Sequence, residues 1–192
     1  MTMENFLKKS CTALFLTASI LTVSADDSVN LIKNPYFEAT DGKITGWGSQ
    51  EKETIESFIN PADSEKCGKI KFTYFTADKK MSKSNIYQLV ADLDPGDYIL
   101  GFSLSGENLK GVFAVVRFQK EPGIMNTGIL GKFEKYIAER EMPEKGKWKK
   151  FVFNLKVTEG SENGVVIIET FGDPDKTGYA LINNVRLAKQ EE

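Results

Sequence analysis

Apolar and polar residues alternate with a period of two along several short stretches of the chain. YILGFSLS, residues 98–105, places Tyr98, Leu100, Phe102 and Leu104 on one face and smaller or polar residues on the other. This period is typical of a half-buried β-strand. Alternation, or a short run rich in β-branched and aromatic residues, recurs in residues 68–76, 84–90, 111–119, 148–157, 164–171 and 179–187.

Turn-forming pairs separate these stretches, and no segment among them has a convincing helical period. Pro-Gly, Glu-Gly, Asn-Gly and Asp-Pro each supply the backbone angles that tight reversals need. The pattern predicts an all-β fold, an antiparallel β-sandwich with jelly-roll topology. Residues 121–147 do not continue this pattern of short alternating stretches. We expect a long connection there, with one short helical turn in KFEKYIAER (132–140), lying over a functional face.

The first 25 residues have the pattern of a secretory signal peptide. Lys8 and Lys9 precede an apolar run of about 13 residues, shorter than the ~20 that cross a bilayer, and Val-Ser-Ala ends at Ala25. An uncleaved membrane anchor is the alternative. We therefore expect a single exported domain over residues 26–192 that is secreted, periplasmic or on the cell surface, without membrane insertion after cleavage.

Composition excludes several classes of function. The chain has no histidine, which removes Ser-His-Asp triads, Cys-His pairs and histidine zinc sites. Without the leader, 23 basic and 26 acidic residues remain, so nothing attracts nucleic acid electrostatically. Cys67 then has no disulfide partner; we interpret it as a small buried residue, with a reactive thiol as the alternative.

Several conspicuous motifs have ordinary interpretations. DLDPGD (92–97) and GDPDKTG (172–178) lack the full ligand pattern of a calcium loop and are interpreted as turns with solvated acids. EKGKWKK (144–150) is interpreted as a solvated loop. We expect Trp47 and Trp148 to lie in the core, with sugar stacking as the alternative role.

Strand parity gives a sharper candidate site. If Ala114, Val116 and Phe118 face the core, the intervening residues of 113–119 line the other face of the sheet, and residues 164–171 divide in the same way. That face would offer a polar floor for sugar hydroxyls beside aromatic rings. The alternative is an exposed salt bridge on an ordinary sheet face, and one bulge would invert the parity. The candidate carbohydrate-binding residues are Tyr87, Phe113, Arg117, Gln119, Glu169 and Phe171.

Four segments taken in order resemble one family. NLIKNPYFEATDGKITGW (30–47), QLVADLDPGDYILGFSLSG (88–106), WKKFVFNL (148–155) and YALINNVRL (179–187) are similar to the galactose-binding-like β-sandwich carbohydrate-binding modules, particularly the cellulose- and xylan-binding families four, nine, sixteen and twenty-two. The resemblance implies a jelly-roll sandwich that recognises glycans on a concave sheet face or at a loop edge. It also implies that both tryptophans are structural.

The resemblance further implies a structural calcium ion where the first and last strands meet. Its ligands would be Glu38 of the opening motif and the closing pair Asn183 and Asn184, where the family has acids. Neutral amides weaken a calcium site. The alternative without an ion is that Asn183 or Asn184 hydrogen-bonds Glu38 or the Asn34-Pro35 turn.

These observations together predict a non-catalytic carbohydrate-binding module whose partner is a glycan. Two rivals remain open: an envelope-associated structural or adhesion sandwich that makes protein contacts, and a small glycan-active enzyme that uses a pair of carboxylates.

Overall fold

The computed structural model of the chain describes residues 29–49, 55–61, 63–64, 66–71, 74–75, 82–123 and 128–190. The predicted signal peptide, residues 1–25, lies outside these residues, as does Phe72 of the 68–76 stretch. Within the described ranges, no helix is long and apolar enough to cross a bilayer.

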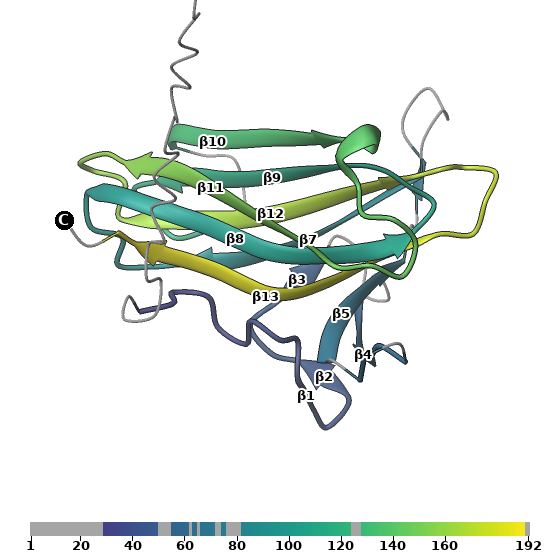
Figure 1. Cartoon of the computed structure of the whole chain (residues 1–192). Helices are drawn as coiled ribbons and strands as arrows, with labels where there is room; N and C mark the ends of the chain where they lie inside the picture. Colours follow the sequence, from purple (N-terminus) through teal and green to yellow (C-terminus); the bar gives the residue numbers. More distant parts are fainter. Residues whose placement is uncertain are drawn as a thin grey trace, which may run out of the picture.

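A six-stranded antiparallel sheet forms one layer of the molecule. Its order is β10 (Ile129–Ala138), β9 (Leu109–Gln119), β12 (Asn163–Gly172), β7 (Ser82–Val90) and β3 (Gly48–Ser49), and β6 (Tyr74–Phe75) also pairs with β7. Long strands that are distant in sequence are neighbours here (Figure 1). The register of β12 with both β9 and β7 is continuous over most of their length, so the middle of this sheet is regular.

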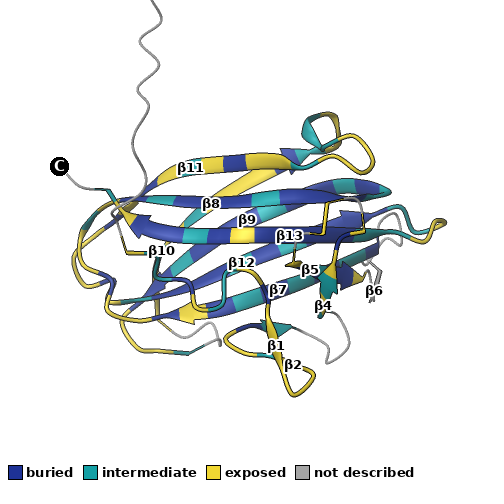
Figure 2. Ribbon diagram, turned by 60° about the horizontal axis from the view of Figure 1, so that its bottom comes forward, coloured by how far each residue is buried: buried dark blue, intermediate teal, exposed yellow. Residues whose placement is uncertain are grey.

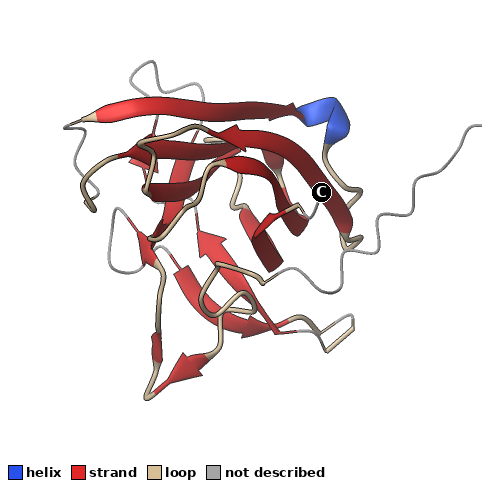
Figure 3. Ribbon diagram, turned by 90° about the vertical axis from the view of Figure 1, so that its left-hand side faces the viewer, coloured by secondary structure: helices blue, strands red, loops and turns tan. Residues whose placement is uncertain are grey.

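A five-stranded antiparallel sheet forms the other layer. Its order is β11 (Lys149–Val157), β8 (Gly96–Glu107), β13 (Tyr179–Lys189), β5 (Lys66–Lys71) and β4 (Ile55–Ile59). A hairpin of β1 (Ala39–Thr40) and β2 (Lys43–Ile44) projects from one side. Figure 3 shows the layers from the side, with the helical turn η1 (Glu139–Glu141) at one margin. The predicted antiparallel β-sandwich is confirmed.

The core lies between the two sheets and follows the alternation in the sequence. Tyr98, Leu100, Phe102 and Leu104 are at most 2% exposed, as their shared parity predicted. Across the sandwich, the predicted inward residues of β9 and β12 are at most 5% exposed, which agrees with their predicted parity. Figure 2 shows β8 and β13 mostly buried and the edge strand β11 with several exposed positions. Burial of apolar surface at about 25 cal/mol per Å² stabilises this arrangement.

The interpretation of residues 132–140 as part of a long loop is wrong. They belong mostly to β10, an edge strand that pairs with β9 over its whole length, and the helical turn follows only at Glu139. Phe133 and Ile137 occupy inward positions opposite Val116 and Val112. The inward position between them is Lys135, which interrupts the apolar alternation. Charged residues are common on edge strands, where they prevent pairing with other chains.

Of the two tryptophans, Trp47 lies in the core and Trp148 does not. Trp47 is 8% exposed and stacks on Phe37 with ring centroids 4.8 Å apart, so its predicted core position is confirmed. Trp148 is only half-buried and lies outside the core, so that prediction is wrong. It precedes β11, and its indole N–H donates to the carboxylate of Asp63. Cys67 is fully buried, as predicted, with its sulfur 3.6 Å from the carbonyl oxygen of Phe58.

Candidate functional site

A groove runs across the outer face of the six-stranded sheet. Its volume is about 510 Å³, within the range of small-molecule and oligosaccharide sites. The register places its residues in cross-strand rows: Tyr87 and Val115 flank Ile167, and Asn85 and Phe113 flank Glu169. The lining residues are Ser49, Asn85, Tyr87, Phe113, Val115, Arg117, Glu134, Val165, Ile167 and Glu169.

The middle of the groove is apolar and its surroundings are polar. Val115 and Val165 are largely buried and Ile167 is half-buried, so together they form a hydrophobic floor. Arg117 lies beside Val165 in the register, and Glu169 follows Ile167 on the same face of β12. Apolar surface with a few directed polar groups suits sugars, which have C–H faces and hydroxyl edges.

Both carboxylates of the groove are ion-paired with lysines. Glu169 Oε1 lies 3.0 Å from Lys83 Nζ, with both side chains less than a third exposed. Glu134 Oε2 lies 2.9 Å from Lys132 Nζ in a more exposed pair. Such pairs add little stability but restrict the carboxylates in position. The groove therefore presents two oriented acceptors and the guanidinium donor of Arg117.

An aromatic cluster stands at the end of the groove nearest β10. The rings of Phe113 and Tyr136 have centroids 4.8 Å apart, and those of Phe113 and Phe171 are 5.7 Å apart, edge to face. Phe171 is 7% exposed whereas Tyr136 is 43% exposed. The exposed surface of this cluster is therefore mainly that of Tyr136, supported from behind by the two phenylalanines.

The structure brings four of the six predicted sugar-site residues into the groove: Tyr87, Phe113, Arg117 and Glu169. Gln119 is not among the lining residues; it is 2% exposed and donates its side-chain amide to the carbonyl of Gly123. Phe171 supports Phe113 without lining the groove. The sequence reasoning missed Asn85, which shares a face with Tyr87 two residues on, and Glu134, because its strand was interpreted as a loop.

The predicted calcium ligands also come together, on the side of the molecule where β13 passes the N-terminal segment. Glu38, Asn183 and Asn184 line a pocket of about 500 Å³ with Tyr36, Lys66 and Ser103. A register shift between Asn183 and Arg186 leaves Asn184, at φ 50°, outside the ladder with β8. The opening segment does lie beside the last strand, as Leu31 and Pro35 bond to Leu187 and Val185, but residues 29–38 form no strand.

The donors in this pocket do not fit a calcium ion. Glu38 is the one carboxylate among the lining residues, and its Oε1 lies 2.8 Å from Lys66 Nζ. Calcium takes six to eight oxygens, usually with several carboxylates, and a lysine ammonium repels it. Across the described ranges, no group of three or more His, Cys, Asp or Glu residues could hold a metal.

Neutral amides organise the opening motif instead. The side-chain oxygen of Asn34 accepts from the Glu38 N–H at 2.7 Å, and its side-chain nitrogen donates to the Glu38 and Thr45 carbonyls. Val185 on β13 donates its N–H to the carbonyl of Pro35 at 3.2 Å. The connection between the NPYFE turn and the last strand is thus made of hydrogen bonds.

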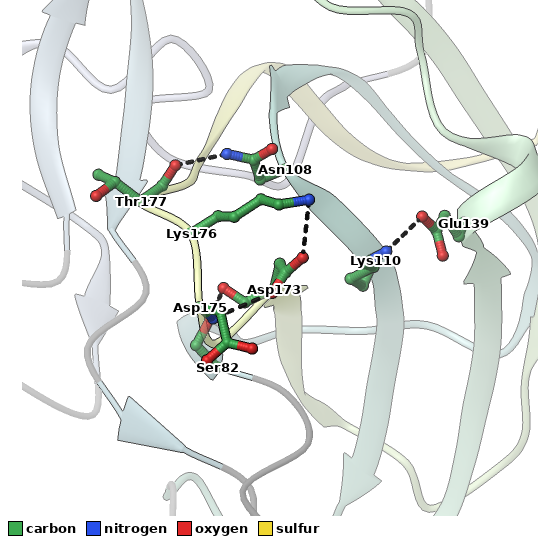
Figure 4. A network of polar contacts seen from close by, with 8 residues as sticks. All are labelled: Ser82, Asn108, Lys110, Glu139, Asp173, Asp175, Lys176 and Thr177. Carbon is green, nitrogen blue, oxygen red and sulfur yellow. Dashed lines mark hydrogen bonds and ion pairs between the residues drawn. The ribbon is translucent and has the colours of Figure 1, made fainter.

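A polar network fixes the loop between β12 and β13 (Figure 4). Asp173 accepts a hydrogen bond from the backbone N–H of Asp175 at 3.0 Å and pairs with Lys176 at 3.2 Å. These two contacts, in that order, hold the pKa of Asp173 below its ordinary value of 3.8. Asn108 donates to the Thr177 carbonyl at 2.7 Å. The carboxylate of Asp173 thus organises its own turn, in keeping with the interpretation of GDPDKTG as a turn.

No protein-family model matches the chain, and a comparison with curated proteins finds no significant match. Solved structures do match. A family 61 carbohydrate-binding module in complex with β-1,4-galactotriose has a TM-score of 0.58 and 19% identity, covering 85% of this chain and 100% of that one. A protein from Bacteroides thetaiotaomicron described as a putative sugar-binding protein has a TM-score of 0.54 and 18% identity, covering 84% and 100%.

A family 16 carbohydrate-binding module matches with a TM-score of 0.52 and 15% identity, over 83% of this chain and 100% of that one. At these identities the likeness is one of fold. The resemblance to β-sandwich carbohydrate-binding modules, which the sequence motifs predicted, is therefore confirmed at the level of the fold.

Proposed function

We propose that this protein is an exported, non-catalytic carbohydrate-binding module that holds a polysaccharide or oligosaccharide in the groove of its six-stranded sheet. The observation that carries the proposal is the groove itself, where an apolar floor of Val115, Val165 and Ile167 lies between Arg117 and Glu169. Sugar rings would lie on the floor and on the Tyr87 ring, and their hydroxyls would bond to the charged side chains.

Fold likeness supports the same conclusion. Three proteins with similar folds are described as carbohydrate-binding or sugar-binding, and one of them was solved with β-1,4-galactotriose. The leader-like residues 1–25 support export. Because fold alone does not determine function, the chemistry of the groove is the stronger argument.

The ion pairs of the groove favour binding over catalysis. A glycosidase needs one carboxylic acid that keeps its proton to give to the leaving group. Glu134 and Glu169 are each held by a lysine: their carboxylate oxygens lie 2.9 Å from Lys132 Nζ and 3.0 Å from Lys83 Nζ. These carboxylates can accept hydrogen bonds from sugar hydroxyls, whereas a carboxyl group that donates a proton to the leaving group would first have to give up its ion pair.

The test is retention of the purified protein on insoluble cellulose, xylan and β-1,4-galactan. We expect retention on at least one, and Arg117→Met should weaken it about tenfold because a charged hydrogen-bond donor is lost. Gln119→Met is the matched control on the same strand, since Gln119 does not line the groove. Retention on none of the three at high loading would contradict the proposal and favour the protein-contact alternative. Release of soluble sugar would favour the enzyme.

A further inference from the structure

β10 forms one edge of the six-stranded sheet (Figure 1). Among the strands that the structure describes, it pairs with β9 alone, so its other side offers backbone donors and acceptors to a further strand. A long exposed edge of this kind is a template for pairing with another chain. β10 also carries Leu130 and Tyr136, which are 55% and 43% exposed. The edge therefore combines an available backbone with apolar surface.

The charges of β10 are arranged so that the strand complements itself. If two copies pair antiparallel about Phe133, each residue lies opposite the one equally far from Phe133 on the other side. Lys132 then lies opposite Glu134 of the second copy, and Glu134 lies opposite its Lys132. Within one chain, Lys132 Nζ already lies 2.9 Å from Glu134 Oε2. Four charges of alternating sign would surround the two-fold axis, and each lysine would gain a second carboxylate.

The other positions of β10 agree with this register. Tyr136 comes opposite Leu130 of the second copy, so two exposed apolar side chains cover each other at both ends of the pairing. Lys135, a charge that opposes pairing with most other chains, comes opposite Gly131, which has no side chain. Moving the centre by one residue would bring two copies of Lys132 or of Glu134 face to face, and like charges directly opposite each other are destabilising. The charges therefore select one register.

The nearby edge of the five-stranded sheet does not complement itself. β11 lies beside β10 at the same margin of the sandwich, where the rings of Phe153 and Phe133 have centroids 6.0 Å apart. The charged residues of β11 are Lys149, Lys150 and Lys156, and the strand contains no acid. Two copies of β11 would bring only positive charge together, which opposes their pairing. At this margin, β10 is thus the edge suited to a second copy.

We propose that this protein forms a two-fold symmetric homodimer in which β10 of one copy pairs antiparallel with β10 of the other about Phe133. The two six-stranded sheets then continue into each other, and their two grooves lie on the same side of the joined sheet. The contact uses both β10 edges, so it closes at two copies and does not build a fibre. The inference goes beyond the proposed function and does not depend on glycan binding.

The experiment is analytical ultracentrifugation of the purified protein from about 1 to about 500 μM. A single strand pair is a small interface, so we expect a dissociation constant on the order of 10 μM. Lys132→Glu and Glu134→Lys should each raise it at least about tenfold, because like charges replace both ion pairs across the axis. The double reversal recreates the alternating charges and should restore the dimer. Lys150→Glu reverses an exposed lysine on β11 and should change nothing.

Hydrogen exchange locates the contact. The backbone amides of β10 should exchange more slowly at concentrations where the dimer forms, and circular dichroism checks that every variant is folded. A wild type that stays monomeric at about 500 μM would overturn the inference. The same holds for single reversals that dimerise as the wild type does, for a folded double reversal that stays monomeric, and for a dimer that protects other strands alone. Retention on polysaccharide is measured separately, so its failure would leave the dimer standing.

Discussion

The side-chain amide of Gln88 is hydrogen-bonded to both backbone groups of Lys33. Its side-chain oxygen accepts from the Lys33 N–H at 2.6 Å, and its side-chain nitrogen donates to the Lys33 carbonyl at 2.8 Å. Gln88 belongs to β7 of the six-stranded sheet, whereas the neighbouring Leu31 donates its N–H to Leu187 of β13 in the other sheet. The segment at residues 30–35 therefore joins the two layers along one side of the sandwich.

Gln88→Glu should destabilise the fold by about 2–3 kcal/mol. Gln88 is 2% exposed, so a glutamate there would lose the donor and place an oxygen against the Lys33 carbonyl. Urea denaturation measures the loss. Gln190→Glu is the control, because Gln190 makes a similar amide contact at an exposed site, and it should change stability by less than about 0.5 kcal/mol. Equal losses of stability in the two variants would show that the Gln88–Lys33 hydrogen bonds have no special importance.

Asn34→Asp should cost about 1–3 kcal/mol of stability. The asparagine nitrogen donates to the carbonyls of Glu38 and Thr45, and aspartate would oppose both with an oxygen. Asn34 has φ 51°, a conformation that aspartate also tolerates, so the change reports the hydrogen bonds and not backbone strain. Asp41→Asn, at the same φ in the exposed β1–β2 turn, is the matched control and should be nearly neutral. Thermal unfolding of both variants provides the comparison.

Calcium should leave the melting temperature unchanged. An ion that binds the native state and not the unfolded chain raises that temperature once its concentration exceeds its dissociation constant. The pocket at Glu38 offers calcium one carboxylate that is already paired with Lys66. Calorimetric scans in millimolar calcium and in excess chelator should therefore superimpose. Lys66→Met removes the ammonium and controls for its repulsion of the ion. A clear rise of the wild-type melting temperature in calcium would show that the metal binds despite the lysine.

The turn at Asp173 should contribute stability that depends on acid pH. Its pKa is lowered in the folded state, first by the Asp175 N–H and then by Lys176. The contribution is therefore present above the ordinary value of 3.8 and is lost as the pH falls through the folded pKa. Asp173→Asn should lower the melting temperature at pH 6, and its difference from the wild type should shrink below pH 3.8.

Asp175→Asn keeps the backbone donor and controls for the loop charge. If the melting temperatures of Asp173→Asn and of the wild type differ by the same amount at pH 6 and below pH 3.8, the carboxylate does not stabilise the turn.

Strand parity predicted much of the groove because two central strands are regular. The outward positions of Arg117 and Glu169 follow from a period of two without any bulge within residues 111–119 or 163–171. Parity could not predict where a side chain turns at the end of a strand. Gln119 bends back to its own loop, a conformation set by Gly123 four residues later.

Register between distant strands is a second limit. The local sequence does not reveal that Glu169 pairs with both Asn85 and Phe113, so it does not associate Asn85 with the site. Edge strands are a third. Because β10 alternates charged and apolar residues imperfectly, the sequence indicates a loop there, and the places of Tyr136 and Glu134 on the sheet follow only from the folded structure.

The last strand lies in the middle of its sheet. β13 is bonded to β8 on one side and to β5 on the other, and Tyr179 pairs with Lys71, more than a hundred residues earlier. A chain still being synthesised therefore has two open sheet edges until residues 179–189 leave the ribosome. Such late, long-range pairing slows folding. The order of synthesis thus delays completion of this sandwich until β13 is available, and a truncation within β13 would divide the five-stranded sheet.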